Sequence, residues 1–202
     1  MKINTYNYLT ILMATLLTSS LIITSASADN SHFDYLEVQF VQQNHNDVDF
    51  DNSFGIEGSA TFYNNWYLTG NTSKSEFATD IGVEADYTNW FLGVGHYWSL
   101  NEDTEIYAQL SAETQKIKSA MTSNDQRGAS IELGTIYQLN EPLSFTAHAR
   151  FSDININSNE DRSQEFYFGG RIDYSLSQQF QIGLGYEIGE FDRLNLGLRF
   201  SF

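Results

Sequence analysis

The sequence predicts an all-β protein, an antiparallel up-and-down transmembrane β-barrel of ten strands. Apolar and polar side chains alternate with a period of two along most of the chain after residue 28, as they do on the two faces of a strand. Short turns recur between these segments at nearly constant spacing, which is typical of stacked hairpins. The 202 residues include no Cys but are 15% aromatic, which excludes a disulfide-stapled domain and a disordered chain.

Residues 1–28 are expected to be a cleaved signal peptide. Lys2 precedes an apolar stretch, Tyr8–Ile23, and Ala26–Ala28 supplies the small residues that signal peptidase requires before a cut. A membrane-anchor helix is the alternative, but Thr and Ser interrupt the apolar run and it is short for a span. Residues 29–202 would then form the barrel domain.

The last strand shows the alternation most clearly. Between residues 193 and 202, Leu or Phe occupies every even position, and a polar residue or Gly occupies every odd one. Eight strands is the alternative count, because the fourth strand and its loop have the weakest pattern. The ten expected strands are Phe33–Gln42, Phe54–Phe62, Trp66–Thr72, Asp86–Trp98, Thr104–Thr114, Ala129–Leu139, Leu143–Phe151, Glu165–Leu176, Phe180–Ile188 and Arg193–Phe202.

Two kinds of connection separate these strands. Tight turns begin at Phe62, Trp98, Tyr137 and Tyr174, which are 36, 39 and 37 positions apart. An even number of strands puts both ends of the barrel wall on this side. The connections at the other end are longer and polar, except for Gly189–Asp192, and they span Asn44–Asn52, Ser73–Ala85, Lys116–Arg127 and Ile154–Gln164.

The composition of the polar face indicates that it points inward. It is rich in Gly, Ser, Gln and Asn, has few Lys, and carries both signs of charge, which could pair across a narrow lumen. Strands of about ten residues cross a bilayer when tilted. A soluble, lipocalin-like barrel with the apolar face inside is the alternative. Aromatic residues near the tight turns would form an interfacial girdle; they are Trp66, Trp98, Tyr137, Tyr174 and Phe202.

Charged side chains on the polar face predict a structural network in the lumen. Bulky inward residues would largely fill the remaining space; these are Tyr67, Phe91, Tyr97, Tyr107 and Tyr167. The expected network comprises Glu37, Glu57, Glu113, Glu132, His148, Arg150, Arg171, Glu187 and Arg199.

Four segments resemble bacterial outer-membrane β-barrels: FDYLEVQFV, FGIEGSATFYNNWYLTGNTS, NWFLGVGHYWSLNEDTEIYAQLSAE and the C-terminal LNLGLRFSF. They are similar to small barrels of the OmpA-like superfamily, and most similar to the family of diffusible-signal-factor-regulated outer-membrane proteins. The resemblance implies a location in the outer membrane of a Gram-negative cell envelope, and it implies little about activity. It also implies that Leu198, Phe200 and Phe202 are the signal recognised by the barrel-assembly machinery.

The charge and the His spacing exclude several functions. The 26 acidic and 10 basic residues give a formal net charge of −16, which argues against nucleic acid as a partner. None of the four His forms a metal-ligand pair such as HxxxH. Asp47, Asp49 and Asp51 alternate and form a weak loop candidate for calcium or magnesium. We otherwise expect no metal and no cofactor.

His148 raises the question of catalysis, since Ser144 shares its face and a Ser–His pair could modify lipid. The surrounding AHARFSD lacks the local motif of such enzymes, and we expect no catalysis. The sequence favours an integral outer-membrane barrel with a structural or surface-interaction role. A small passive pore for ions or small solutes is the alternative, and a lipid-modifying enzyme is less favoured. The expected partners are outer-membrane lipid, lipopolysaccharide and the assembly machinery, and we expect a monomer.

Overall fold

The computed structural model describes residues 32–45, 48–49, 53–78, 84–119, 123–155, 162–189 and 192–202. Strands are the regular secondary structure of these residues, and no helix among them is long and apolar enough to cross a membrane. The expected signal peptide, residues 1–28, lies outside them.

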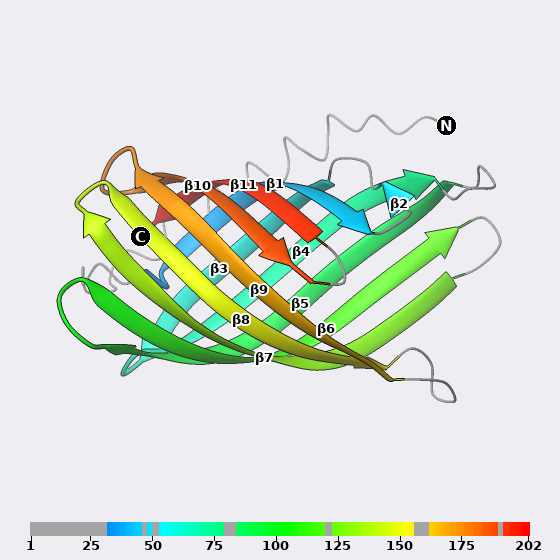
Figure 1. Ribbon diagram of the computed structural model, residues 1–202, viewed down its shortest axis with the longest axis horizontal. Coiled ribbons are helices and arrows are strands. Elements are labelled where there is room, and N and C mark those ends of the chain that lie inside the picture. The colour runs from blue at the N-terminus through cyan, green and yellow to red at the C-terminus, as the bar shows by residue number, and fades with distance from the viewer. Residues whose placement is uncertain are drawn as a thin grey trace. The chain divides into compact units, whose positions relative to one another are not determined.

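Ten antiparallel strands close into a barrel, which confirms the predicted count and excludes eight strands. Each strand pairs with the next, and the last returns to pair with the first from Tyr35–Ser201 to Asn44–Asp192 (Figure 1). Closure pairs the backbone N–H and C=O groups that the first and last strands would otherwise leave without partners at a sheet edge. The strands are β1 (Tyr35–His45), β3 (Ser53–Tyr63), β4 (Trp66–Ala78), β5 (Glu84–Ser99), β6 (Thr104–Ser119), β7 (Ser123–Asn140), β8 (Leu143–Asn155), β9 (Arg162–Ser175), β10 (Phe180–Ile188) and β11 (Asp192–Ser201).

An additional two-residue strand, β2 (Val48–Asp49), pairs with the end of β1. The sequence did not predict it, because it falls in the polar connection expected over Asn44–Asn52. β2 lengthens one hairpin and does not take part in closing the barrel.

Tight turns join the strands at one end, called here the short-turn end. In the first turn, Asn64 and Asn65 have φ angles of 38° and 67°, and positive φ at both central residues is what a two-residue type I′ hairpin requires. Asn tolerates this conformation better than most residues. The barrel wall begins and ends here, since Tyr35 pairs with Ser201. The opposite end is called the long-loop end.

The strands β4 to β7 extend further toward the long-loop end than predicted. Polar loops were expected over 73–85 and 116–127, and the prediction is wrong for the parts of both ranges that the structure describes, which are paired strand. Charged residues alternate there and meet across strands: Lys74 Nζ lies 2.9 Å from Asp86 Oδ1, and Lys116 Nζ lies 3.2 Å from an oxygen of Asp125. The polar composition had concealed the alternation.

The outer face of the wall is apolar and the inner face is polar. Val38, Leu184 and Leu196 are 50%, 52% and 49% exposed, whereas Glu37, Gln43 and Ser152 are almost completely buried. Of the aromatic residues expected near the tight turns, Trp66, Trp98, Tyr137 and Tyr174 face outward and are exposed. Phe202, which follows β11, is also exposed. This is the reverse of an ordinary globular protein.

Inward glycines make room for the interior side chains. A Cβ atom on Gly95 would lie 2.2 Å from Cζ of Tyr67, the residue opposite it on β4, and one on Gly134 would lie 2.3 Å from Cζ of Tyr107. Each tyrosine ring therefore lies over the glycine of the neighbouring strand.

Candidate functional site

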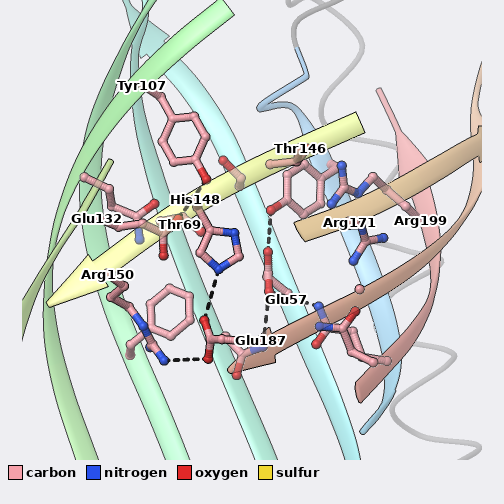
Figure 2. Close-up of a pocket in the computed structure, with 18 of the residues that line it drawn as sticks. Glu57, Thr69, Tyr107, Glu132, Thr146, His148, Arg150, Arg171, Glu187 and Arg199 are labelled. Atoms are coloured by element: carbon pink, nitrogen blue, oxygen red, sulfur yellow. Dashed lines mark hydrogen bonds and ion pairs between the residues drawn. The ribbon is translucent and has the colours of Figure 1, made fainter. Parts of the chain in front are cut away.

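The barrel interior is the candidate functional site, because the charged side chains expected there point into it, and Glu187 is bonded to both His148 and Arg150 (Figure 2). Strand alternation explains their placement. Each lies at a position whose immediate neighbours in sequence face outward, so ten separate strands can deliver their polar residues to one enclosed space.

One group of charges, the Glu37 cluster, consists of Glu37, Arg171, Asp173 and Arg199. Glu37 is fully buried at 0% exposure, and both its carboxylate oxygens accept from Arg171, at 2.8 and 2.9 Å. Arg199 Nε donates to Glu37 at 2.8 Å, and Arg171 Nε donates to Asp173 at 2.7 Å. Two cations and two anions thus neutralise one another, with the bidentate geometry that makes Arg–carboxylate pairs strong.

A second group, the Glu187 cluster, consists of Glu113, His148, Arg150 and Glu187. Arg150 donates to Glu187 at 2.9 Å and to Glu113 at 3.4 Å. The His148 Nε2 atom lies 3.0 Å from the other oxygen of Glu187. Because Arg150 joins β6 to β10 through these two glutamates, this cluster ties distant parts of the wall together across the lumen.

Glu57 and Glu132 are bonded differently, because their hydrogen-bond donors are neutral. Glu57 accepts from the Tyr35 hydroxyl, from Gln39 at 2.9 Å and from Asn71 at 3.3 Å. Glu132 accepts from the Tyr107 hydroxyl at 2.8 Å. Among the described residues neither carboxylate forms an ion pair, although both line the interior cavity.

Sequence reasoning missed Asp173 of the Glu37 cluster, and it missed the neutral donors to Glu57, which are Tyr35, Gln39 and Asn71. Asp173 lies two residues from Arg171, so it shares the inner face of β9, and this spacing was the signal. Tyr35 donates to Glu57 and its ring lies 3.8 Å below the Arg199 guanidinium. Tyr35 was assigned to a strand, but nothing in its neighbourhood marked it as a partner for two charges.

A cavity of about 180 Å³ runs along the interior between the charged groups. The bulky residues expected to fill the lumen lie around it: Tyr67, Tyr107 and Tyr167 are buried, Phe91 lines the cavity, and Tyr97 packs against the aromatic residues at the short-turn end. Side chains therefore fill part of the lumen and leave this cavity between them.

Phe33 and His32 contribute to this interior, although they precede β1. The sequence placed Phe33 in the first strand, and that boundary is wrong, because strand pairing begins at Tyr35. Phe33 instead lies among Tyr67, Tyr97 and Tyr107, and it is only 6% exposed. The period of two continues through Phe33, so the sequence could not separate it from the strand.

The geometry does not assemble the Ser–His pair considered for catalysis. Ser144 and His148 both face inward on β8, but four residues of strand separate their Cα atoms by about 13 Å. A nucleophile and its base need a direct hydrogen bond. His148 is bonded to Glu187 instead, as a member of an ion-pair network.

The described residues contain no group of three or more His, Asp or Glu side chains placed to hold a metal ion. The acidic loop candidate is not among them: Asp47 and Asp51 lie outside the described residues, and only the backbone of Asp49, in β2, is described.

Comparison with known proteins identifies the fold. No protein-family model matches the chain, and no curated protein matches it significantly. Three solved structures are similar. The β domain of the Bordetella autotransporter BrkA has a TM-score of 0.53 and 12% identity, over 84% of this chain and 99% of that one. An outer membrane channel from Pseudomonas putida F1 has a TM-score of 0.52 and 11% identity, over 88% and 99%. The NanC porin has a TM-score of 0.51 and 10% identity, over 83% and 100%. At these identities the likeness shows the fold alone.

Proposed function

We propose that the chain is an integral β-barrel protein of the outer membrane of a Gram-negative cell, with a structural or surface-interaction role and no catalysis. The observation that carries the proposal is the outer face of the wall. In water, so large and continuous an apolar surface would be an aggregation hazard, whereas in a bilayer it is the surface that contacts lipid. The strands are also long enough to cross, since β1, β3, β10 and β11 contain 11, 11, 9 and 10 residues.

The side chains that bond and pack across the interior support a structural role. Both charged clusters bridge separate strands, and aromatic rings pack across the short-turn end. Such a lumen stiffens the barrel and leaves its outer face and the long-loop end as the parts that would meet the surroundings. The proposed partners there are outer-membrane lipid and lipopolysaccharide, and the proposed state is a monomer.

Export and assembly follow from the same proposal. Residues 1–28 would direct export and be removed. Leu198, Phe200 and Phe202 would then present the assembly signal, with Leu198 pointing outward at 51% exposure. We also propose that the chain belongs to the OmpA-like superfamily and, within it, to the diffusible-signal-factor-regulated family. The sequence resemblance supports this assignment.

Fractionation combined with gel mobility tests the location. We expect the protein in the outer-membrane fraction, and we expect unboiled samples in SDS to migrate as a compact species that shifts on boiling, because a closed barrel resists the detergent. A soluble protein whose mobility does not depend on heating would contradict the proposal.

A passive pore for ions or small solutes is the second candidate, and the interior cavity of about 180 Å³ favours it. Planar-bilayer recording separates the two candidates. A structural barrel in its resting state should give no steady unit conductance. Steady conductance from the unmodified protein would make the pore the better assignment.

A further inference from the structure

Arg193 differs from the three other arginines that line the interior cavity. Arg150, Arg171 and Arg199 each form an ion pair with a buried carboxylate, at 2.9, 2.8 and 2.8 Å. Among the residues that the structure describes, the Arg193 guanidinium has no such partner, and its Nε atom is buried without a hydrogen bond. Because a buried donor without an acceptor is costly, this group favours an acceptor from outside the chain.

Gln43 places a second unused donor next to Arg193. The two residues lie directly opposite each other in the pairing of β1 with β11, and opposite residues of an antiparallel pair have Cβ atoms about 4.5–5.5 Å apart. Gln43 is 2% exposed, and its Nε2 atom is buried without a hydrogen-bond partner. Gln43 and Arg193, called here the donor pair, therefore lie side by side near the long-loop end.

Asn195 adds an acceptor on the same inner face. It lies two residues after Arg193 in β11, so the two side chains point to the same side, and both line the cavity. The Oδ1 atom of Asn195 is buried and has no hydrogen-bond donor. The side chain lies over Gly185 of β10, where a Cβ atom would come within 3.1 Å of its Cγ. Two unused donors and one unused acceptor thus occur together.

The carboxylate opposite Arg193 on the other side is already engaged. Glu187 of β10 is the Cα partner of Arg193, but its two oxygens are bonded to Arg150 and His148, at 2.9 and 3.0 Å (Figure 2). Its charge is therefore satisfied by these two groups, and Arg193 keeps its capacity to bind an anion.

Two other carboxylates line the cavity, and neither is bonded to the donor pair. Glu57 lies opposite Glu37, which is six residues from Gln43 along β1 and so about 20 Å away. Glu132 lies opposite Arg150, a cation on the neighbouring strand. Neither carboxylate therefore neutralises the donor pair.

We propose that Gln43, Arg193 and Asn195 form a binding subsite in the barrel interior for a small carboxylate that carries a neighbouring hydroxyl group. The two oxygens of a carboxylate match the edge of a guanidinium and accept further donors, so they accept from the donor pair. The hydroxyl donates to Asn195 Oδ1, and as a neutral donor it adds no cation beside Arg193. The inference goes beyond the proposed structural role, because it gives the interior a ligand of defined chemistry.

The size of the cavity suits such a ligand. Its volume is about 180 Å³, whereas a single water needs roughly 10–15 Å³ on the same measure. A molecule of several heavy atoms therefore fits beside the donor pair.

Three small molecules of similar size test the subsite in the detergent-folded barrel. Lactate has both groups, propionate lacks the hydroxyl, and lactamide replaces the carboxylate with a neutral amide. Saturation-transfer NMR titrations in deuterated detergent, at constant ionic strength, give the affinity of each. We expect lactate to bind tightest, propionate roughly threefold or more weakly, and lactamide roughly tenfold or more weakly than lactate.

Variants assign the individual contacts. Arg193→Gln should weaken lactate binding roughly tenfold or more, because it removes a charge-assisted hydrogen bond. Asn195→Ala should reduce the affinity for lactate to that for propionate and leave propionate binding unchanged, because it removes only the acceptor for the hydroxyl. Gln43→Leu should weaken the binding of both carboxylates by about the same factor. Arg127→Gln makes the same change at an exposed arginine of β7 and should have no effect.

Contrary results would overturn specific parts of the inference. Unchanged lactate binding by Arg193→Gln, in protein that keeps its heat-dependent mobility, would overturn the subsite. Equal binding of lactate and lactamide by the unmodified protein would do the same without any variant. Equal binding of lactate and propionate would overturn the hydroxyl preference and the role of Asn195. A folded barrel that binds none of the three saturably would show that water alone serves these groups. The outer-membrane location is decided separately, by the fractionation test.

Discussion

The inner and outer faces of the barrel wall are built from the same strands, yet different interactions determine which residues each face accepts. The outer face is a broad apolar surface, on which side chains such as Leu184 and Leu196 are exposed to similar degrees and have no specific partners to match. The inner face is a set of specific pairs, in which Glu37 or Arg150 has particular partners at hydrogen-bond distance.

This difference implies that the two faces tolerate different substitutions. If the outer face contacts lipid, as we propose, an apolar side chain there can be exchanged for another apolar one, because burial in hydrocarbon is non-directional. A buried charge has no such freedom, since removing its partner leaves it desolvated and unpaired. The residues of the outer face therefore need only be apolar, whereas those of the inner face must match particular partners in position and charge.

The largest expected effect follows from removing the charge at the centre of the inner face. Glu37→Gln keeps the shape of the side chain but leaves Arg171 and Arg199 without their shared carboxylate. We expect a loss of about 3–5 kcal/mol in the free energy of unfolding, measured by urea titration of the barrel in phosphatidylcholine vesicles. Glu102→Gln, the same change in an exposed turn, is the control and should be near neutral. Equal effects for the two variants would show that the lumen is open to water.

The sequence predicts the apolar and polar faces well, but it does not predict the contacts within the inner face. The period of two located the ten strands and the side each residue faces, because alternation is a local property. It placed Glu37 and Arg171 on the same face. It could not show that they bond, since 134 residues separate them and the contact depends on closure of the barrel. The ends of strands were less predictable, and Phe33 and the charged residues of β6 and β7 were assigned to the wrong elements.

The next largest effect tests the outer face. Leu196→Arg, near the middle of β11, places a charge among side chains that we propose contact lipid. We expect a loss of about 2–4 kcal/mol in the same titration. Leu100→Arg, in an exposed turn at the short-turn end, should lose no more than about 1 kcal/mol, because the penalty decreases toward the interface. If Leu196→Arg were as mild as Leu100→Arg, the wall would face water, and the contrast between the two faces would fail.

A smaller effect compares one substitution on both faces. Gly95 faces inward, and a Cβ atom there would lie 2.2 Å from the buried ring of Tyr67. We expect Gly95→Ala to lose about 1–3 kcal/mol through overpacking. Gly170 faces outward, where a Cβ atom would lie 3.6 Å from Phe145, an ordinary contact. Gly170→Ala should be neutral or slightly stabilising, because Gly weakens a strand. The reverse order of stabilities would mean that the interior can readjust around an added methyl group.

The smallest effect comes from a charge pair on the outer surface beyond the apolar region. Lys74 and Asp86 lie 2.9 Å apart, like the atoms of the Glu37 cluster, but their side chains are 56% and 44% exposed. Water screens such a pair, and ordering two long side chains opposes it. A double-mutant cycle of Lys74→Ala and Asp86→Ala should therefore give a coupling free energy of about 0.2–1 kcal/mol. This coupling should fall further in 1 M salt, where the Debye screening length is about 3 Å.

The corresponding cycle for Glu37→Gln and Arg171→Gln should give a larger coupling free energy that changes little with salt, because both groups are shielded from ions. A strong, salt-resistant coupling between Lys74 and Asp86 would place that extension of β4 and β5 in a low-dielectric environment, and the boundary between the lipid-facing wall and its water-exposed extension would have to be moved.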